Sequence, residues 1–232
     1  MDKKGFTLVE VLIALAISGL LMTAVYSAFQ SQQKSYLAQD QVAEMQQNIR
    51  AALSAVMQEL RMAGYDPYSS GTVGITAAGP TSVTFTMVAD DDGIDNDNAD
   101  GDDDTSTGAD EVGELKTITF MHYDAYSDGV MDIGRQVGSN PSSKRAIAEN
   151  IEELEFYYTL KNDSQTLTPT TSQLTQIRSI EISILAKTTH PDRNYTNTQT
   201  YFSASGAEWG PYTDNFRRRF QSTVVRCRNL QM

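Results

Sequence analysis

Cysteine, histidine and basic residues are scarce in this 232-residue sequence, and each low count argues against one kind of structure or function. Cys227 is the single cysteine, so the chain cannot close an intramolecular disulfide. Its two histidines, His122 and His190, lie far apart in sequence, and no nucleophile motif accompanies either, so an enzyme is not expected. Lysine and arginine number 18 against 30 acidic residues, and the net charge of −12 argues against nucleic acid as a partner, because phosphates require a basic footprint.

Charge is also nearly absent from a long apolar run near the N-terminus, which follows "KKG". From Phe6 to Phe29, Glu10 is the only charged residue. A run of this length can cross a bilayer as a helix, in which a carboxylate costs about 2.5 to 3.5 kcal/mol on insertion scales. A cleaved secretory signal is not expected, since the only A-x-A pattern lies inside the run. A plain membrane anchor explains neither Glu10 nor the glycine before Phe6.

The stretch "KKGFTLVEVLIALAISGLL" resembles the N-terminus of type IV pilin and pseudopilin precursors. The resemblance implies that a prepilin peptidase cuts between Gly5 and Phe6 and methylates the new N-terminus. It also implies that Glu10 pairs with the N-terminal amine of a neighbouring subunit in the filament. Two charges that are costly in lipid would then neutralise each other only when subunits stack in register. The alternative is that Glu10 extends to the cytoplasmic interface of the membrane.

The helix is expected to continue beyond the membrane, because residues 30–63 contain no glycine or proline. Gly64 and Pro67 predict its end. A stripe of apolar residues at spacings of three and four indicates one buried face, formed by Val42, Met45, Ile49, Leu53, Val56 and Leu60.

After Gly64 the hydrophobic period changes to two, which predicts antiparallel strands. The expected strands lie in 83–88, 115–123, 151–160, 177–187 and 217–230. The predicted fold class is therefore α+β: a long N-terminal helix, membrane-spanning in its first half, packed on an antiparallel β-sheet domain. Residues 124–132 are expected only to connect two strands.

The segments "IAENIEELEFYY", "IRSIEISILAK" and "RRRFQSTVVRCRNL" resemble the PilW family of minor pilins and the related J-type minor pseudopilins of type II secretion. The lone cysteine departs from major pilins, which usually close a C-terminal loop with a disulfide. The retained Glu10 departs from K-type tip pseudopilins. A PilW-like or J-like minor subunit is therefore expected.

An acidic segment, residues 90–111, is the one candidate for a metal site. Its alternating carboxylates, asparagines and glycines are typical of calcium loops, since calcium takes six to eight oxygen ligands. The candidate ligands are Asn96, Asn98, Asp100, Asp102 and Asp104. The segment departs from the EF-hand pattern at both ends, and the alternative is a solvated acidic hairpin loop.

Two features near the C-terminus are interpreted as structural. Trp209 is expected to be a packing anchor. Five arginines in a strand-like context are expected to form a solvated edge: Arg217, Arg218, Arg219, Arg226 and Arg228.

The predicted organisation is a leader (1–5), a transmembrane or filament-core helix (6–29), an amphipathic helix (30–63) and a β-rich head (64–232) in the periplasm and then in the filament. The expected function is that of a minor pilin near the tip of a type IV pilus, with roles in assembly and cell adhesion. The expected partners are prepilin peptidase, other pilins and the inner membrane. The alternatives are a J-type pseudopilin and a membrane-anchored calcium-dependent binding protein.

Overall fold

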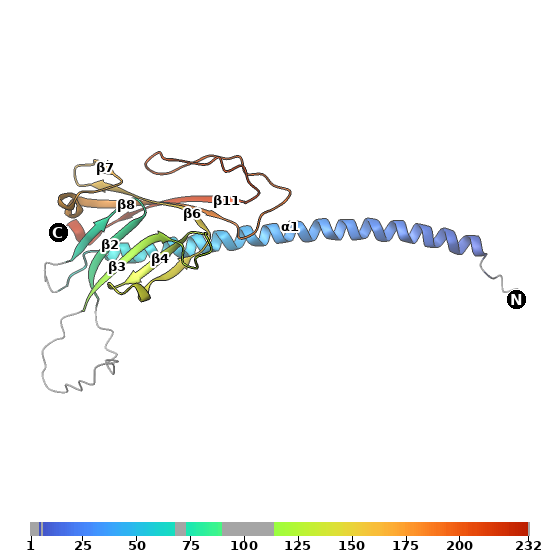
Figure 1. The fold of residues 1–232 in the computed structure, drawn as a ribbon, viewed down its shortest axis with the longest axis horizontal. Helices are drawn as coiled ribbons and strands as arrows, with labels where there is room; N and C mark the ends of the chain where they lie inside the picture. The colour runs from blue at the N-terminus through green and yellow to red at the C-terminus, as the bar shows by residue number, and fades with distance from the viewer. Residues whose placement is uncertain (1–4, 6, 68–72, 90–113, 232) are drawn as a thin grey trace, which may run out of the picture. The chain divides into compact units, whose positions relative to one another are not determined.

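The computed structural model describes residues 5, 7–67, 73–89 and 114–231. The chain divides into two compact units, Met1–Glu44 and Met45–Met232, and the helix α1 (Leu8–Met62) contributes to both. Figure 1 shows α1 followed by the strands of the second unit. The predicted long N-terminal helix is confirmed, and so is the α+β class.

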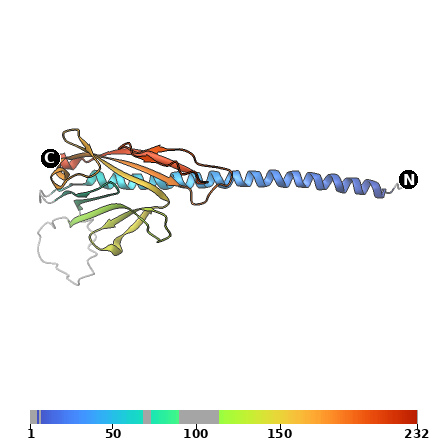
Figure 2. The ribbon, with the colours of Figure 1, turned by 45° about the horizontal axis from the view of Figure 1, so that its top comes forward.

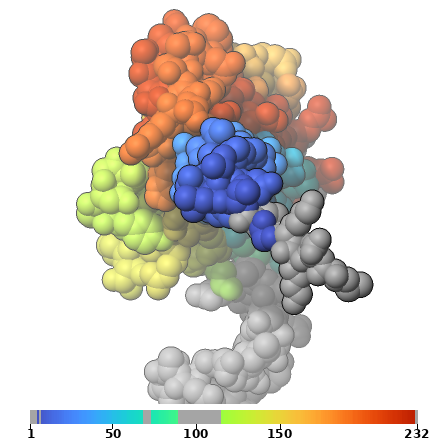
Figure 3. All heavy atoms as spheres, turned by 90° about the vertical axis from the view of Figure 1, so that its right-hand side faces the viewer, coloured from blue at the N-terminus to red at the C-terminus, as the bar shows by residue number. Residues whose placement is uncertain are grey.

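Among its described residues, the second unit has two larger antiparallel sheets, of five and four strands, where the sequence predicted one antiparallel sheet. The first has the order β1-β2-β3-β4-β5 and the second has the order β11-β8-β6-β7. Figure 3 shows them as separate regions, with the orange and red C-terminal segments apart from the yellow-green strands β3 to β5. The strands of the first sheet are β1 (Gly74–Ala78), β2 (Ser82–Ala89), β3 (Glu114–Tyr123), β4 (Asp132–Val137) and β5 (Arg145–Ala148). Those of the second are β6 (Ile151–Leu160), β7 (Gln165–Thr166), β8 (Ile177–Lys187) and β11 (Arg218–Arg226).

Shorter elements complete the second unit. A two-stranded sheet pairs β9 (Tyr201–Phe202) with β10 (Glu208–Trp209). Three 3-10 helices are η1 (Pro141–Ser143), η2 (Thr171–Gln176) and η3 (Arg228–Gln231).

The core of the second unit lies between α1 and the inner faces of both sheets. The predicted apolar stripe supplies the helix side, and all of its residues from Met45 onward are buried, together with Ala52. Opposite it, Phe85 and Phe120 stack with ring centroids 6.2 Å apart on adjacent strands, and Phe156 lies beside Ile182 in the β6–β8 register. These side chains are fully buried, and each contributes about 1.5 to 3 kcal/mol on burial.

Polar contacts attach α1 to each sheet. Both carboxylate oxygens of Glu59 on the helix share the single Nε–H of Arg135 on β4, at 2.7 and 2.9 Å. On the other side, the hydroxyl of Thr223 on β11 lies 3.4 Å from the sulfur of Met57. The helix is therefore held by both sheets rather than laid across one.

The helix ends as its sequence predicts. Gly64 has φ +77°, a left-handed conformation that glycine adopts without a Cβ penalty, and its N–H donates to the carbonyl of Thr86 on β2. A Cβ there would lie 2.6 Å from a methyl group of Leu230 on η3, and Asn229 donates to the carbonyl of Arg61 in the last helical turn. The C-terminal η3 thus packs directly on the end of α1.

The connection between β8 and β11, residues 188–217, covers part of the outer face of the second sheet, where the sequence predicted half-buried strands. We call these residues the flap. Ser183 and Leu185 on the outer face of β8 are fully buried. Figures 1 and 2 both show β8 and β11 side by side with the flap above them.

Candidate assembly site

Glu10 lies in the first turn of α1, where it forms a capping box with Thr7. The backbone N–H and the hydroxyl of Thr7 both donate to Oε2 of Glu10, at 2.8 and 2.9 Å. The N–H of Glu10 in turn lies 3.3 Å from the hydroxyl of Thr7. The carbonyl of Thr7 accepts the first helical hydrogen bond, from Val11. Thr7 is thus the N-cap residue and Glu10 the third helical residue, the reciprocal arrangement that satisfies free N–H groups at a helix start.

This capping role was not predicted, although its signal is present in "TLVE". Threonine followed three residues later by glutamate before an apolar run is the capping-box pattern. A carboxylate in the first turn is also favoured by the positive end of the helix dipole. Part of the cost of Glu10 in an apolar helix is therefore offset within the chain.

The cap uses one oxygen of the Glu10 carboxylate. Both bonds from Thr7 reach Oε2, and no hydrogen bond to Oε1 of Glu10 is found among the described residues. A carboxylate accepts through two oxygens, so Glu10 can receive an external donor without losing its cap.

The rest of this part of α1 is apolar on every side. Leu8, Leu20 and Met22 are each more than 70% exposed, and the most apolar 18-residue stretch of the helix has no buried residue. By length and composition, α1 can cross a membrane. An unburied apolar helix in water is unfavourable, which supports a lipid or protein environment for it.

Of the other residues predicted for this site and for the metal site, the structure describes only Gly5. Gly5 is exposed. Phe6 lies outside the described residues, as do Asn96, Asn98, Asp100, Asp102 and Asp104. The acidic segment connects β2 to β3, whose ends pair through Ala89 and Glu114.

Within the described ranges, no group of three or more histidine, cysteine or acidic residues is arranged to hold a metal ion. The acids of the β3–β4 turn are used by the backbone, as predicted for a simple connection. Asp124 accepts from the N–H of Gly129 at 2.9 Å, which lowers the pKa of its carboxyl. Asp132 is almost fully buried and accepts from the N–H groups of Ala125 and Asn150, while burial raises its pKa.

The candidates for catalysis are structural residues. The Nε2 of His122 lies 2.9 Å from the carbonyl of Ile151, and burial lowers the pKa of the imidazole. Trp209 packs edge-on against Phe220 with centroids 6.0 Å apart. Burial raises the pKa of the Cys227 thiol to about 12, so it is not a nucleophile at neutral pH.

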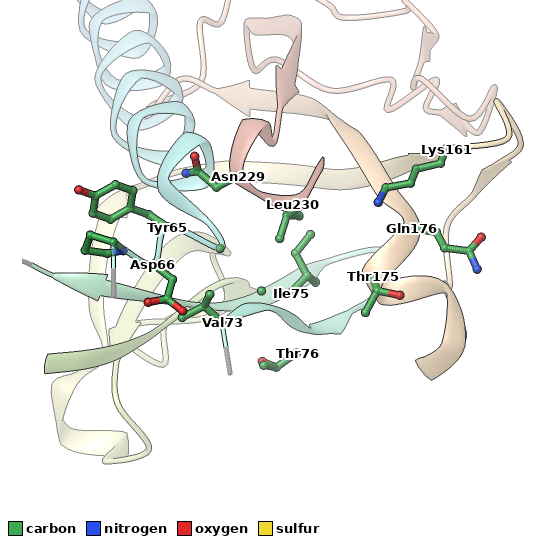
Figure 4. A pocket seen from close by; sticks show the side chains of 13 residues that line it. Tyr65, Asp66, Val73, Ile75, Thr76, Lys161, Thr175, Gln176, Asn229 and Leu230 are labelled. Carbon is green, nitrogen blue, oxygen red and sulfur yellow. The ribbon is translucent and has the colours of Figure 1, made fainter. Parts of the chain in front are cut away.

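A pocket of about 1020 Å³ lies where the end of α1 meets β1, η2 and η3. Figure 4 shows Asp66 and Lys161 on opposite sides of it, with Ile75 and Leu230 between them. Neither histidine lines this pocket. Its side chains do not converge on one reacting position, so the pocket does not suggest an active site.

The arginine prediction is wrong for Arg218. Its side chain is fully buried and pairs with Glu152 and Asp214, while its guanidinium lies 3.9 Å from the ring centroid of Tyr212. Arg217 pairs with Asp192 at 2.8 Å. Of the five C-terminal arginines, Arg219, Arg226 and Arg228 are exposed.

Comparison with known proteins agrees with this geometry. Residues 1–26 match the model of the prokaryotic N-terminal methylation motif, and residues 127–229 match that of type IV pilus-assembly protein W. No curated protein matches the chain. A solved structure of a type IV-like pilin from Thermus thermophilus is similar in fold, with a TM-score of 0.52 at 13% identity over 80% of this chain and 96% of that one.

The methylation motif covers the capped start of α1, and the second match covers most of the strands that pack on the same helix. The fold similarity covers 80% of the chain. The predicted resemblance to prepilins at the N-terminus and to PilW over residues 127–229 is therefore confirmed, on a pilin-like fold.

Proposed function

We propose that this protein is a minor pilin of a type IV pilus. Prepilin peptidase removes residues 1–5 from an inner-membrane precursor and methylates Phe6. Residues 6–29 then leave the membrane for the filament core, residues 30–63 connect them to the head, and residues 64–232, which face the periplasm before assembly, contact other pilins near the tip. The family and the fold are those of structural proteins and support this non-catalytic role.

The observation that carries the proposal is the capped carboxylate of Glu10, whose Oε1 accepts no hydrogen bond from a described residue. In a bilayer, an unsatisfied carboxylate oxygen is unfavourable, and a neighbour's N-terminal ammonium removes that penalty while its own charge is neutralised. The Thr7 bonds hold Oε2 and fix the side chain at the helix start. Thr7 is therefore a positioning residue for the charge pair.

Substitutions can separate capping from charge pairing. Glutamine is accepted at the third position of a capping box, so Glu10→Gln retains the cap and removes the charge. Glu10→Ala removes both. Thr7→Ala removes the N-cap side chain, which contributes about 1 kcal/mol, and keeps the charge.

We expect Glu10→Gln and Glu10→Ala to be cleaved normally but to reach sheared filaments at similarly low levels, measured by immunoblot against the membrane fraction. Thr7→Ala should be affected less. Glu10→Gln at wild-type levels in filaments, with Glu10→Ala depleted, would show that Glu10 only caps the helix. A J-type pseudopilin would use the same site, and the subunits that co-purify with the protein distinguish secretion components from minor pilins.

A further inference from the structure

β11 forms one edge of the four-stranded sheet, and half of its backbone groups point away from its only strand partner. The β8–β11 register runs without a bulge from Arg218 to Arg226. At its two ends, the N–H of Thr188 donates to the carbonyl of Arg217, and the N–H of Cys227 donates to the carbonyl of Arg178. Odd-numbered residues of β11 therefore face β8, and the alternate residues face outward. The outward set is Arg218, Phe220, Ser222, Val224 and Arg226.

The flap covers only the first half of this strand. Trp209 packs on Phe220, and Asp214 binds the guanidinium of Arg218. Beyond them Ser222, Val224 and Arg226 are exposed, with 54% of Val224 accessible. In the described part of the chain, no backbone hydrogen bond joins these three residues to anything outside their sheet.

The open part of the edge is positively charged. Arg226 and the following Arg228 are exposed at its end, and neither forms an ion pair with a described residue. They stand out in a chain of net charge −12. Charged side chains on an edge strand can simply deter other strands, and they also select for opposite charge in a strand that does add.

A second copy of β11 does not suit this edge. An antiparallel pair over the open residues, centred on Val224, would set Arg226 of each copy opposite Ser222 of the other and offer it no acidic side chain. A parallel pair in register would set each arginine beside its equivalent. Like charges directly opposite destabilise a strand pair. An occupant with acidic side chains avoids this repulsion.

We propose that the open edge of β11, from Ser222 to Arg226, binds an extended segment of another protein by strand addition, and that this segment carries acidic side chains beside Arg226. Main-chain hydrogen bonds supply affinity and the arginines supply selectivity. The surface is separate from Glu10 and does not depend on the proposed filament role.

The test uses the full-length protein in detergent micelles and a fluorescent nine-residue peptide that alternates glutamate with threonine. A lysine–threonine peptide controls for charge. The same glutamate peptide with alternate backbone nitrogens methylated keeps the charge and cannot complete the ladder. Fluorescence anisotropy measures binding, and hydrogen exchange measures protection of the amides of Ser222, Val224 and Arg226.

We expect saturable binding of the glutamate peptide only, with slowed exchange at the three outward amides. Val224→Pro removes an N–H that β8 does not use, so it should fold and bind about three- to tenfold more weakly, whereas the matched Val224→Thr should bind like wild type. Arg226→Glu should weaken binding at least as much, and it decides the question if Val224→Pro fails to fold.

Three outcomes overturn the proposal. If the lysine peptide binds as well as the glutamate peptide, charge selection is excluded. If the methylated peptide binds as well, strand addition is excluded. No saturable binding means that the arginines only deter other strands. Concentration-dependent dimers that Val224→Pro abolishes would identify a second copy as the occupant.

Discussion

Replacing Arg218 should destabilise the second unit more than any other arginine substitution in β11. Its Nη2 donates to Asp214 at 2.6 Å and to Glu152 at 3.0 Å, and its side chain has no exposed surface. Removing one partner of a buried ion pair costs about 3 to 5 kcal/mol, because the other charge stays behind. Here the two carboxylates keep 17% and 34% of their surface, so water can solvate them in part. We therefore expect Arg218→Met to cost about 2 to 3 kcal/mol.

The single tryptophan offers a local probe. Trp209 lies in the flap and packs against Phe220 on β11, so its fluorescence reports the structure around Arg218. With a urea m-value of about 2 kcal/mol/M, Arg218→Met should lower the unfolding midpoint by about 1 to 1.5 M. Arg219→Met, at an exposed neighbouring position, should change the stability by no more than about 0.5 kcal/mol. Equal midpoints for the two variants would refute the reasoning.

The pH dependence gives a second check on the same ion pair. Hydrogen bonds from Arg218 hold the pKa of Asp214 below its usual value of 3.8. A depressed carboxyl pKa contributes stability that is fully present above the unfolded value and is lost as the pH falls through the folded value. Wild type should therefore lose stability on acidification below about pH 4, and Arg218→Met should lose less over the same range.

Three further predictions concern other parts of the chain. Gly5→Val should leave the precursor uncut, whereas wild type should begin at a methylated Phe6; intact mass measures both, and residues 1–5 in assembled filaments would contradict the prediction. Cys227 should react with maleimide only on unfolding, since its thiol is buried with a pKa of about 12; rapid labelling of native protein in a gel-shift assay would count against this. Calcium at a hundred times its dissociation constant should add about 2.7 kcal/mol to the free energy of unfolding, more than magnesium does at matched ionic strength. The double variant Asp100→Asn/Asp102→Asn should abolish this difference. If calorimetry shows no saturable calcium uptake, the segment is a solvated acidic loop.

The sequence predicted the elements whose burial follows a simple period. The α1 stripe from Met45 to Leu60 repeats every three or four residues because one face meets the sheets, and β8 shows alternation because Ile180, Ile182 and Ile184 face the core. Each pattern reflects one environment per face. Such elements can be identified without knowing their partners.

β4 was missed because its burial depends on distant residues. Its buried part, Asp132–Gly134, begins with a carboxylate that is satisfied by N–H groups from the neighbouring turn and from Asn150. A Cβ on Gly134 would lie 2.2 Å from the ring of Tyr123 on β3, so glycine there makes room for that ring. Neither contact leaves an apolar period in the sequence.

Glu155, on the outer face of β6, is another residue whose burial depends on contacts that are distant in sequence. Alternation in "IEELEFYY" places it toward solvent, yet it is buried and accepts hydrogen bonds from the hydroxyls of Ser203 and Ser205 and from the N–H of Ser205. Serines in a loop give no sequence signal for such a contact. The flap was therefore predictable only as a connection, although it closes half of a sheet face.

The flap also explains why one run of arginines has two different environments. Glu152 and Glu155 place negative charge on the outer face of β6. Arg218, the first residue of β11, neutralises Glu152, and the flap serines Ser203 and Ser205 donate hydrogen bonds to Glu155. Past Phe220 the flap no longer follows β11, so the strand keeps its ladder to β8 but lacks a cover. Arg226 is exposed for that reason, on a strand whose register with β8 is already fixed by the buried Val225. A partner strand would thus meet an edge that is held rigid on one side and open on the other, a geometry that reduces the entropy lost when the partner binds.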